Sequence, residues 1–337
     1  MSLPAWHPEA LAARLPFLRR RGLLTAATRA FFTARGYTEV ETPYAVPAPG
    51  EEVHLRAFAT EYRGPRGESV PLWLNTSPEF AMKKLLAGGA GPIFQLARVW
   101  RNEEASPTHA PEFTMLEWYR PGASLADLMD ETEAYLRAVL PPVVSSRGIT
   151  TSLQHFERLT VAEAFARYAG ADVLATEGDA AGLAREAGAT LRAGESWEDL
   201  FFRLLLDRIE PHLGRAHPTF LTHYPASQAA LARRCPHDPR VALRFEIYVC
   251  GQELANAFEE LTDAAEQRAR FQADRARRLA LYGPDWPLDA DFLSAIEMLP
   301  PCAGIALGFD RLAMMASNAT SIDQVLWLPG TADAIYR

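Results

Sequence analysis

The sequence predicts an α+β fold in which an antiparallel β-sheet is flanked by helices. Residues 92–119 and 241–261 each have the pattern of two antiparallel strands, because β-branched, aromatic and other apolar residues are interrupted there by turn formers. Residues 125–139 and 160–210 lie between these regions and are rich in Ala, Leu and Glu, which favour helices. We therefore expect a single domain over residues 1–337, with a mostly helical insert at about 123–215.

The first predicted element is a helix over residues 23–35. Its apolar residues have helical spacing, and the pattern stops at Gly36. Residues 37–42 then include β-branched residues and end at Pro43, which predicts a strand directly after the helix.

The hairpin predicted over residues 92–119 carries the most chemical information. Residues 92–101 are largely apolar and end in charge, residues 102–111 are rich in turn formers, and residues 113–119 alternate apolar and polar side chains. The segment gathers arginine, several carboxylates, a histidine and five aromatic residues. It is therefore suited to bind a ligand that is both anionic and aromatic.

A second strand pair is predicted in the last third of the chain. Residues 241–250 form one strand, Gly251 marks the turn, and residues 253–261 return. Glu246, Glu253 and Glu260 recur along this pair. A turn can bring Glu246 and Glu253 together as Mg²⁺ ligands, and solvent-exposed strand charge explains them equally well.

Residues 301–312 predict a final strand that runs into a helix. Gly304, Ala306 and Gly308 occupy alternate positions and would clear one face of the strand for a flat ring, while Arg311 begins the helix. Close packing of the sheet against the helix is an equally good explanation of the small residues.

Composition excludes several classes of protein. A chain of 337 residues with 48% hydrophobic and 23% charged content is ordinary for a globular protein. It has no long apolar run and no signal peptide pattern, so we expect a cytoplasmic protein without a membrane segment. The three cysteines lack metal-ligand spacing, and a net charge of -8 argues against sequence-independent nucleic-acid binding.

Three segments, in order, resemble the signature motifs of the class II aminoacyl-tRNA synthetases. Residues 23–43 resemble the first motif, Arg101-Asn102-Glu103 with Pro111-Glu112-Phe113 the second, and residues 304–311 the third. The lysine subgroup is the most similar, because residues 76–79, 101–104, 111–115, 253–256 and 260–263 all resemble lysyl-tRNA synthetase. The resemblance covers nearly the whole chain and implies the class II catalytic fold.

Length separates two branches of that subgroup. The first-motif helix begins about twenty residues into the chain, whereas lysyl-tRNA synthetases of this class carry an anticodon-binding domain before it. The chain therefore resembles the truncated paralogues, the elongation factor P (R)-β-lysine ligases, which residues 116–121 and 220–229 match closely. The resemblance implies adenylation of β-lysine, elongation factor P as the acceptor protein, and no anticodon-binding domain. A homodimer is also expected, because the apolar faces of residues 23–43 exceed what one small sheet covers.

The resemblance also implies a site for ATP and Mg²⁺. Arg101 would bridge the substrate carboxylate and the α-phosphate, and Arg311 would lie on the adenine opposite Phe113 and reach the γ-phosphate, so these arginines are the expected catalytic residues. Glu246 and Glu253 would hold the Mg²⁺ ion. The full expected ATP-binding set is Arg101, Asn102, Glu103, His109, Phe113, Glu246, Ile247, Gly308 and Arg311.

The expected amino-acid site is built for a cationic side chain. A buried ammonium needs a countercharge, which Glu260 with Tyr119 would supply, while Ser77, Glu79 and Asn256 would hold the head group. The full expected set is Ser77, Pro78, Glu79, Tyr119, Glu253, Asn256, Glu260 and Ala306. Glu79 can also be interpreted as a carboxylate that stabilises the start of a helix.

The chain departs from the families it resembles at two places. Ala306 stands where lysyl-tRNA synthetases have Gly, and its methyl group would press on the head-group end of the pocket, which fits β-lysine better than α-lysine. Residues 106–110 lack the usual basic residue near 107 and the usual Asn at 110, which would weaken ATP binding without changing the reaction.

Three alternatives remain open from the sequence. One is a lysyl-tRNA synthetase-like enzyme that charges tRNA or another acceptor with lysine, and another is an asparagine-synthetase-like member of the fold, which Glu260 and Tyr119 fit less well. The third is a non-catalytic ligand-binding paralogue. Such a paralogue would be expected to lose Arg101, Arg311 or the pair of Glu246 and Glu253, and all four are present.

Overall fold

The computed structural model describes residues 3–283 and 286–329. They form two compact units: the first combines the N-terminal part up to Ser124 with the part that follows from Leu261, and the second spans Leu125–Glu260. Among the described residues, no helix combines the length and the apolar character that a membrane span requires.

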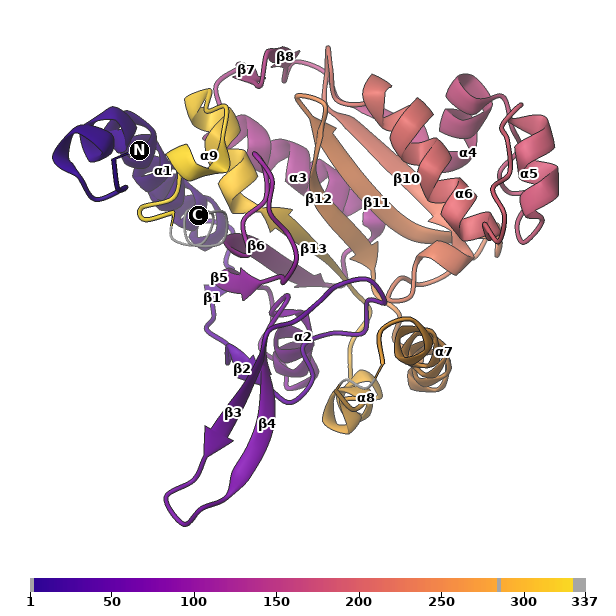
Figure 1. Ribbon diagram of the computed structural model, residues 1–337, viewed down its shortest axis with the longest axis horizontal. Helices are drawn as coiled ribbons and strands as arrows, with labels where there is room; N and C mark the ends of the chain where they lie inside the picture. The colour runs from indigo at the N-terminus through magenta and orange to yellow at the C-terminus, as the bar shows by residue number, and fades with distance from the viewer. Residues whose placement is uncertain (1–2, 284–285, 330–337) are drawn as a thin grey trace. The chain divides into compact units, whose positions relative to one another are not determined.

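The first unit is built around a mixed sheet with strand order β1-β5-β6-β13. Only β1 and β5 are parallel among these neighbours, and a separate small sheet has the order β2-β4-β3 (Figure 1). The strands are β1 (Thr38–Glu39), β2 (Ala45–Val46), β3 (Ala59–Arg63), β4 (Ser69–Leu74), β5 (Ile93–Trp100), β6 (Glu112–Pro121) and β13 (Cys302–Gly308). The helices are α1 (Pro8–Thr33), α2 (Glu79–Ala87), α7 (Ala264–Tyr282), α8 (Ala290–Ile296) and α9 (Phe309–Ser317), with a 3-10 turn η5 (Ile322–Gln324).

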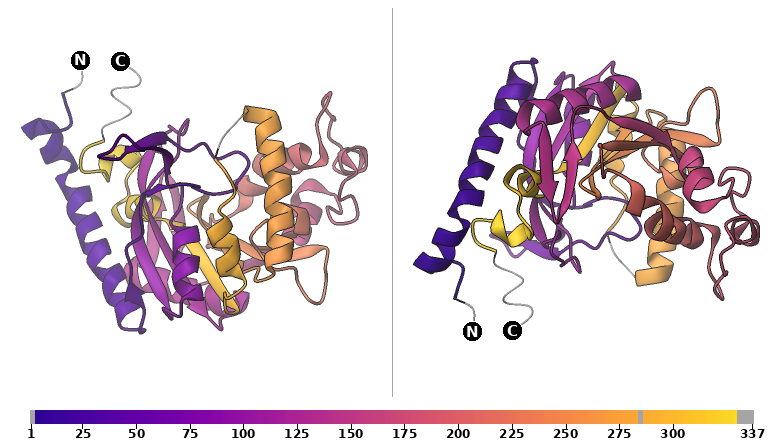
Figure 2. Two further views of the ribbon diagram at one scale, coloured as in Figure 1. Left: turned by 90° about the horizontal axis from the view of Figure 1, so that it is seen from below. Right: turned by 90° about the horizontal axis from the view of Figure 1, so that it is seen from above.

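Helices α1 and α9 run side by side against one face of this sheet (Figure 2). Phe32 of α1 lies with its ring centroid 4.9 Å from that of Phe94 and 5.0 Å from that of Trp118. All three rings are fully buried. This aromatic cluster fixes the long helix to β5 and β6 and belongs to the hydrophobic core of the first unit.

The helix predicted over residues 23–35 is wrong in its start, because α1 begins at Pro8. His7 caps the helix by accepting a hydrogen bond from the Glu9 N–H, and Pro8 occupies the first turn, where a missing N–H costs nothing. The strand predicted over residues 37–42 is shorter than expected. Only Thr38–Glu39 form β1, although the Val40 N–H still donates to Phe94 O at 2.9 Å.

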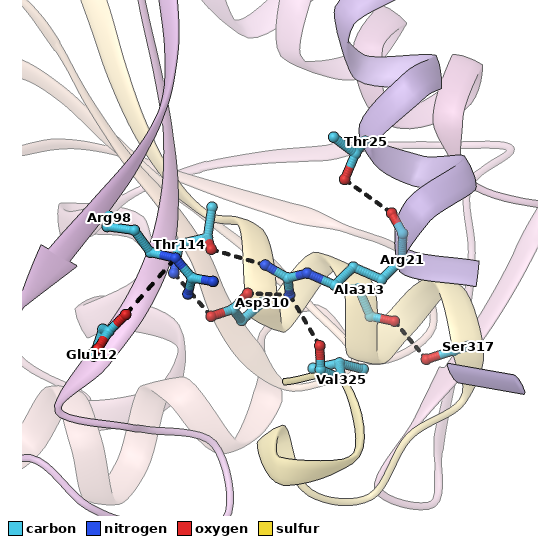
Figure 3. A network of polar contacts seen from close by, with 9 residues as sticks. All are labelled: Arg21, Thr25, Arg98, Glu112, Thr114, Asp310, Ala313, Ser317 and Val325. Carbon is cyan, nitrogen blue, oxygen red and sulfur yellow. Dashed lines mark hydrogen bonds and ion pairs between the residues drawn. The ribbon is translucent and has the colours of Figure 1, made fainter. Parts of the chain in front are cut away.

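A buried ion pair joins α1 to the start of α9. Arg21 Nη1 contacts Asp310 Oδ1, and Arg21 Nη2 donates to Thr114 Oγ1 at 2.8 Å (Figure 3). The second carboxylate oxygen of Asp310 accepts from the Thr114 N–H at 2.9 Å. Three segments that are far apart in the sequence therefore meet in one polar network inside the core.

The second unit contains a sheet with strand order β12-β11-β10-β9, in which only β9 and β10 are parallel neighbours. Its strands are β9 (Glu157–Thr160), β10 (Thr219–Pro225), β11 (Val241–Val249) and β12 (Gln252–Glu259), and β7 (Val143–Ser146) and β8 (Ile149–Ser152) form a separate hairpin. Its helices are α3 (Leu125–Val139), α4 (Val161–Ala164), α5 (Ala180–Glu186) and α6 (Trp197–Leu204), with π turns η1 (Phe165–Ala169) and η2 (Leu205–Ile209) and 3-10 turns η3 (Glu210–His212) and η4 (Ala226–Gln228).

The predicted α+β class is confirmed, and the local predictions differ in accuracy. The helix predicted over residues 125–139 matches α3, and both predicted strand pairs form. Residues 160–210 are helical in short pieces, because Gly170 ends the first piece in a left-handed conformation and capping residues restart the later ones. The predicted insert also contains three short strands, which the helix-favouring composition did not indicate.

We predict that Asp310→Asn lowers the free energy of unfolding by about 3 kcal/mol, because it leaves the buried Arg21 guanidinium without its countercharge. Glu39→Gln is the matched control. Glu39 of β1 pairs with Arg29 of α1 at an exposed position, so this pair should contribute less than about 1 kcal/mol to stability. Urea unfolding of both variants measures the difference. Equal small losses would show that the buried pair does not hold α1 to α9.

Candidate active site

One face of β6 carries the residues with which the site begins. Phe113, Met115, Glu117 and Tyr119 point to the same side, because side chains alternate along a strand. The neighbouring strand β13 places small residues beside them in register: Gly304 opposite Tyr119, Ala306 opposite Glu117 and Gly308 opposite Met115. Small residues on β13 therefore share a face with the acidic and aromatic residues of β6.

Arg101 follows β5 and lies against Phe113. Its guanidinium carbon is 5.3 Å from the centroid of the Phe113 ring, and its Nε is buried without a hydrogen-bond partner among residues 3–283 and 286–329. A buried donor of this kind is costly unless a ligand satisfies it. An anionic group bound beside Phe113 would do so.

The next two residues form a tight turn. The Glu103 N–H donates to Asn102 Oδ1 at 3.0 Å, and Glu103 has a φ of 67°. Left-handed backbone is unfavourable for a residue with a Cβ by roughly 1–2 kcal/mol. The turn holds Glu103, whose side chain is exposed, two residues after Arg101.

His109 and Arg311 contact each other. Arg311 Nη2 lies 2.5 Å from His109 Nε2, and His109 Nδ1 lies 2.7 Å from Ser106 Oγ. Burial, together with the guanidinium groups of Arg311 and Arg101, lowers the pKa of His109 to about 4. The imidazole is therefore neutral near pH 7, its Nε2 accepts from Arg311, and its protonated Nδ1 donates to Ser106.

Residues 106–110, which depart from the family pattern, form a closed turn. The main chains of Ser106 and His109 exchange hydrogen bonds of 3.1 and 3.2 Å. Pro107 O accepts from the Ile322 N–H at 2.8 Å, and Ala110 is buried. The segment therefore has a defined shape without the family's basic residue and Asn.

A buried carboxylate lies at the other end of the face. Glu117 is fully buried, and its two oxygens accept from Ser77 Oγ at 2.5 Å and from the Tyr119 hydroxyl at 2.9 Å. Burial and then the neighbouring Glu79 raise the pKa of Glu117 to about 8, against the smaller opposite effects of Ser77, Tyr119 and Lys83. The site therefore holds a carboxyl group that a cation would readily convert to its charged form.

Sequence reasoning missed Glu117 and Lys83. The alternation of Phe113, Met115, Glu117 and Tyr119 could have found Glu117, because it places the carboxylate on the face that carries the expected site residues. Lys83 is buried one turn after Glu79 and donates to Glu79 Oε1 at 2.5 Å. A lysine in a helix with (i, i+4) spacing to a glutamate normally indicates a surface pair, so the sequence gives no signal for it.

Glu79 stands at the start of α2, which agrees with its interpretation as a helix-start carboxylate. Pro78 is the N-cap residue and makes no side-chain capping bond, while Ser77 Oγ accepts from the Glu79 N–H at 3.0 Å. Glu79 also pairs with Lys83, and its carboxylate raises the pKa of Glu117. Ser77 links the helix start to the buried carboxylate.

The second unit holds the other expected site residues on β11 and β12. Glu246 is buried, and its oxygens accept from Arg244 Nη2 at 2.5 Å and from the Tyr248 hydroxyl at 2.7 Å. Arg244 Nε also donates to Asn256 Oδ1 at 3.0 Å, and its guanidinium lies 4.2 Å from the centroid of Tyr224. Burial, and then the charge of Glu246, raise the pKa values of the Tyr224 and Tyr248 hydroxyls well above the usual value of tyrosine.

Glu253 lies near this cluster. It stands opposite Tyr248 in the register and contributes to the raised pKa values of Tyr224, Arg244 and Tyr248. Ile247 and Glu260 are buried in the same unit. The predicted turn thus brings Glu246 and Glu253 to adjacent strands.

The expected residues are divided between the two units. The first unit contains Ser77, Pro78, Glu79, Arg101, Asn102, Glu103, His109, Phe113, Tyr119, Ala306, Gly308 and Arg311, and the second contains Glu246, Ile247, Glu253, Asn256 and Glu260. Within each unit the fold gathers residues that are distant in sequence. The ligand roles of all of them stay predictions.

Comparison with known proteins identifies the family. Residues 13–332 match the model of the class II tRNA synthetases (D, K and N). The chain belongs to this family. The resemblance indicated by its three motifs is therefore confirmed, and so is the class II fold.

Curated relatives in this family are similar over almost their full length. A protein from Klebsiella pneumoniae is 44% identical over 95% of this chain and 96% of its own, and one from Proteus mirabilis is 42% identical over 98% of both. A third, from Pseudoalteromonas translucida, is 44% identical over 97% of this chain and 98% of its own. All three carry the name elongation factor P–(R)-β-lysine ligase.

We predict that Glu117 makes stability fall as the pH rises. Its pKa in the folded protein is about 8, above the ordinary 4.5, so the folded state binds one more proton than the unfolded state between these values. The free energy of unfolding should therefore decrease by at most about 1.4 kcal/mol per pH unit across this range.

Urea unfolding of the wild type and of Glu117→Gln from about pH 5 to 8 measures this effect, because glutamine removes the titration while keeping the shape. The difference in stability between the two proteins should change with pH. Parallel curves would contradict the raised pKa.

Proposed function

We propose that the protein activates (R)-β-lysine with ATP as an acyl-adenylate and transfers it to a lysine side chain of elongation factor P. The observation that carries this proposal is the buried Glu117 carboxyl, held by Ser77 and Tyr119 opposite Ala306, in a chain of the class II synthetase family. The names of its full-length relatives support the same ligase activity.

The reaction needs no enzyme nucleophile. A carboxylate oxygen of the amino acid attacks the α-phosphorus of ATP and pyrophosphate leaves, and the acceptor amine then attacks the acyl carbon and AMP leaves. The protein must position two anions and stabilise the charge that builds up on phosphorus. Arg101 and Arg311 are the cations that we propose for this, since Arg101 has an unsatisfied buried donor and Arg311 contacts the neutral imidazole of His109.

The nucleotide would bind beside Phe113, at one end of the β6 face that carries the site. The adenine would stack on its ring, with Arg311 on the other side, because a guanidinium and an aromatic ring are both favourable neighbours of a purine. Asn102, Glu103, His109, Ile247 and Gly308 remain proposed contacts of the nucleotide on the strength of the family resemblance.

Glu246 and Glu253 have the donor type that Mg²⁺ requires. Mg²⁺ is usually held by one or two carboxylates together with substrate phosphates, and the described residues contain no group of three or more His, Cys, Asp or Glu placed to hold a metal. Two carboxylates with nucleotide phosphates therefore fit the ion, whose charge would offset the repulsion between phosphates and protein. A Glu253→Gln variant that binds Mg²⁺ and ATP as tightly as the wild type would contradict this role.

We propose that Glu117 receives the amino group of the substrate's head group, because it lies opposite Ala306 and accepts from Ser77, both of which are expected at that end of the pocket. A carboxyl with a pKa near 8 becomes ionised when a cation binds beside it, and its hydrogen bonds from Ser77 and Tyr119 already support the charged form. The roles proposed for Glu79, Asn256 and Glu260 toward the amino acid rest on the resemblance.

We predict that Ala306→Gly lowers the preference for β-lysine over α-lysine roughly tenfold, because one methyl group in a pocket commonly discriminates by this amount. ATP–pyrophosphate exchange with each lysine measures the ratio. Ala303→Gly is the matched control, because Ala303 lies on the opposite face of β13. An unchanged ratio in Ala306→Gly would remove Ala306 as the selecting residue.

The decisive experiment incubates the enzyme with ATP, Mg²⁺, β-lysine and elongation factor P and measures the mass of the intact factor. We expect an increase of one β-lysyl group that depends on ATP and is lost in Arg101→Ala. Labelled tRNA in a parallel reaction should remain uncharged. A mass that does not change, or a charged tRNA, would overturn the proposed acceptor.

We further propose a homodimer formed through α1. Leu23 on this helix and Trp6 just before it are 65% and 67% exposed, which leaves apolar surface for a second copy. Sedimentation at micromolar concentration tests this, and a monomer would contradict it. A cytoplasmic location is proposed because the acceptor is a translation factor.

A further inference from the structure

Arg56 brings a positive charge from a distant loop to the nucleotide turn. It lies between β2 and β3, and its main-chain carbonyl accepts from the Asn102 N–H at 2.7 Å in an isolated β-bridge. Its Nε is 3.8 Å from Glu103 Oε1. The two residues that follow Arg101 are therefore in contact with Arg56 through both main chain and side chain.

Helix α7 fixes the position of this guanidinium. The Arg56 guanidinium carbon lies 4.5 Å from the centroid of the Tyr282 ring, whose hydroxyl is 2.9 Å from His54 Nδ1. Earlier in the same loop, Glu51 Oε2 accepts from Arg278 at 2.9 Å in a fully buried pair. The loop is thus attached to α7 through Glu51, His54 and Arg56, which reduces the entropy that Arg56 must lose when it binds a ligand.

The nucleotide turn itself lacks a cation. Residues 102–111 contain two glutamates, Glu103 and Glu104, and no Lys or Arg. His109 does not supply a positive charge, because it is neutral near pH 7. A triphosphate placed along this turn would face two carboxylates without a countercharge from the turn.

Arg56 has donors available for such a ligand. Its side chain is 36% exposed, and its contact with Glu103 involves Nε at a distance too long for a hydrogen bond. A guanidinium has five N–H donors in a planar fork that matches phosphate oxygens. Arg56 can therefore keep its place against Tyr282 and Glu103 while it donates to a phosphate.

We propose that Arg56 is a nucleotide-binding residue that contacts the β- or γ-phosphate of ATP and supplies the charge that the turn lacks at Pro107. This proposal rests on the proposed function, because it assumes that ATP binds at this turn. It differs from the simpler interpretation of Arg56 as a surface ion pair with Glu103, which would contribute little to anything but local stability.

The test compares the dissociation constants of ATP and AMP, each with Mg²⁺, by calorimetry. Arg56→Met keeps the stem against Tyr282 and removes the charge, so ATP binding should weaken roughly tenfold while AMP binding changes less than about twofold. Arg56→Lys should recover most of the ATP affinity. Arg63→Met is the control, because Arg63 is 82% exposed on β3 and pairs only with Glu61 among the described residues.

A second-site substitution makes the test specific. Pro107→Arg, added to Arg56→Met, should restore ATP affinity if Arg56 supplies the charge missing at 107. Equal losses for ATP and AMP, or unchanged ATP affinity in Arg56→Met, would overturn the role of Arg56. A wild-type protein that does not bind ATP would instead overturn the proposed function, so the two failures are distinguishable.

Discussion

The buried pair of Arg21 and Asp310 is the interaction on which the first unit depends. An arginine and an aspartate removed from water are stable only when each retains its partners, and Thr114 supplies hydrogen bonds to both. The pair fixes α1, β6 and the first turn of α9 relative to one another. Thr114 faces this network while its neighbours Phe113 and Met115 face the site, so a shift of β6 by one residue would disrupt core and site together.

The fold could be predicted where local pattern and tertiary environment agree. Helix α3 and the strand pairs β5–β6 and β11–β12 follow from periodicity and turn residues. The early start of α1 could not be predicted, because Pro16 and several charged residues interrupt its apolar spacing while contacts with the C-terminal segment stabilise it. Arg14, for example, donates to Leu326 O at 2.7 Å, a contact that no local pattern reveals. The two-unit division depends in the same way on long-range contacts.

The candidate site was predictable in its residue types and less so in its interactions. The motifs identified Arg101, Phe113, Tyr119 and Arg311, and the structure gathers them in the first unit. Sequence alone could not reveal that the pKa of Glu117 is raised, because the shift depends on the burial of Glu117 and on the charge of Glu79 in another element. The contact of His109 with Arg311 likewise joins two motifs that are far apart in the chain.

The contact between His109 and Arg311 has a consequence for the proposed nucleotide. Arg311 already donates to a neutral imidazole, so a molecule that recruits this arginine must offer a better acceptor than His109 Nε2. A phosphate oxygen is such an acceptor, because a hydrogen bond between two charged groups is stronger than one to a neutral nitrogen. A bare purine or nucleoside offers no comparable acceptor. Under the proposed function, His109 would compete with the ligand for Arg311, which would favour nucleotides over uncharged bases.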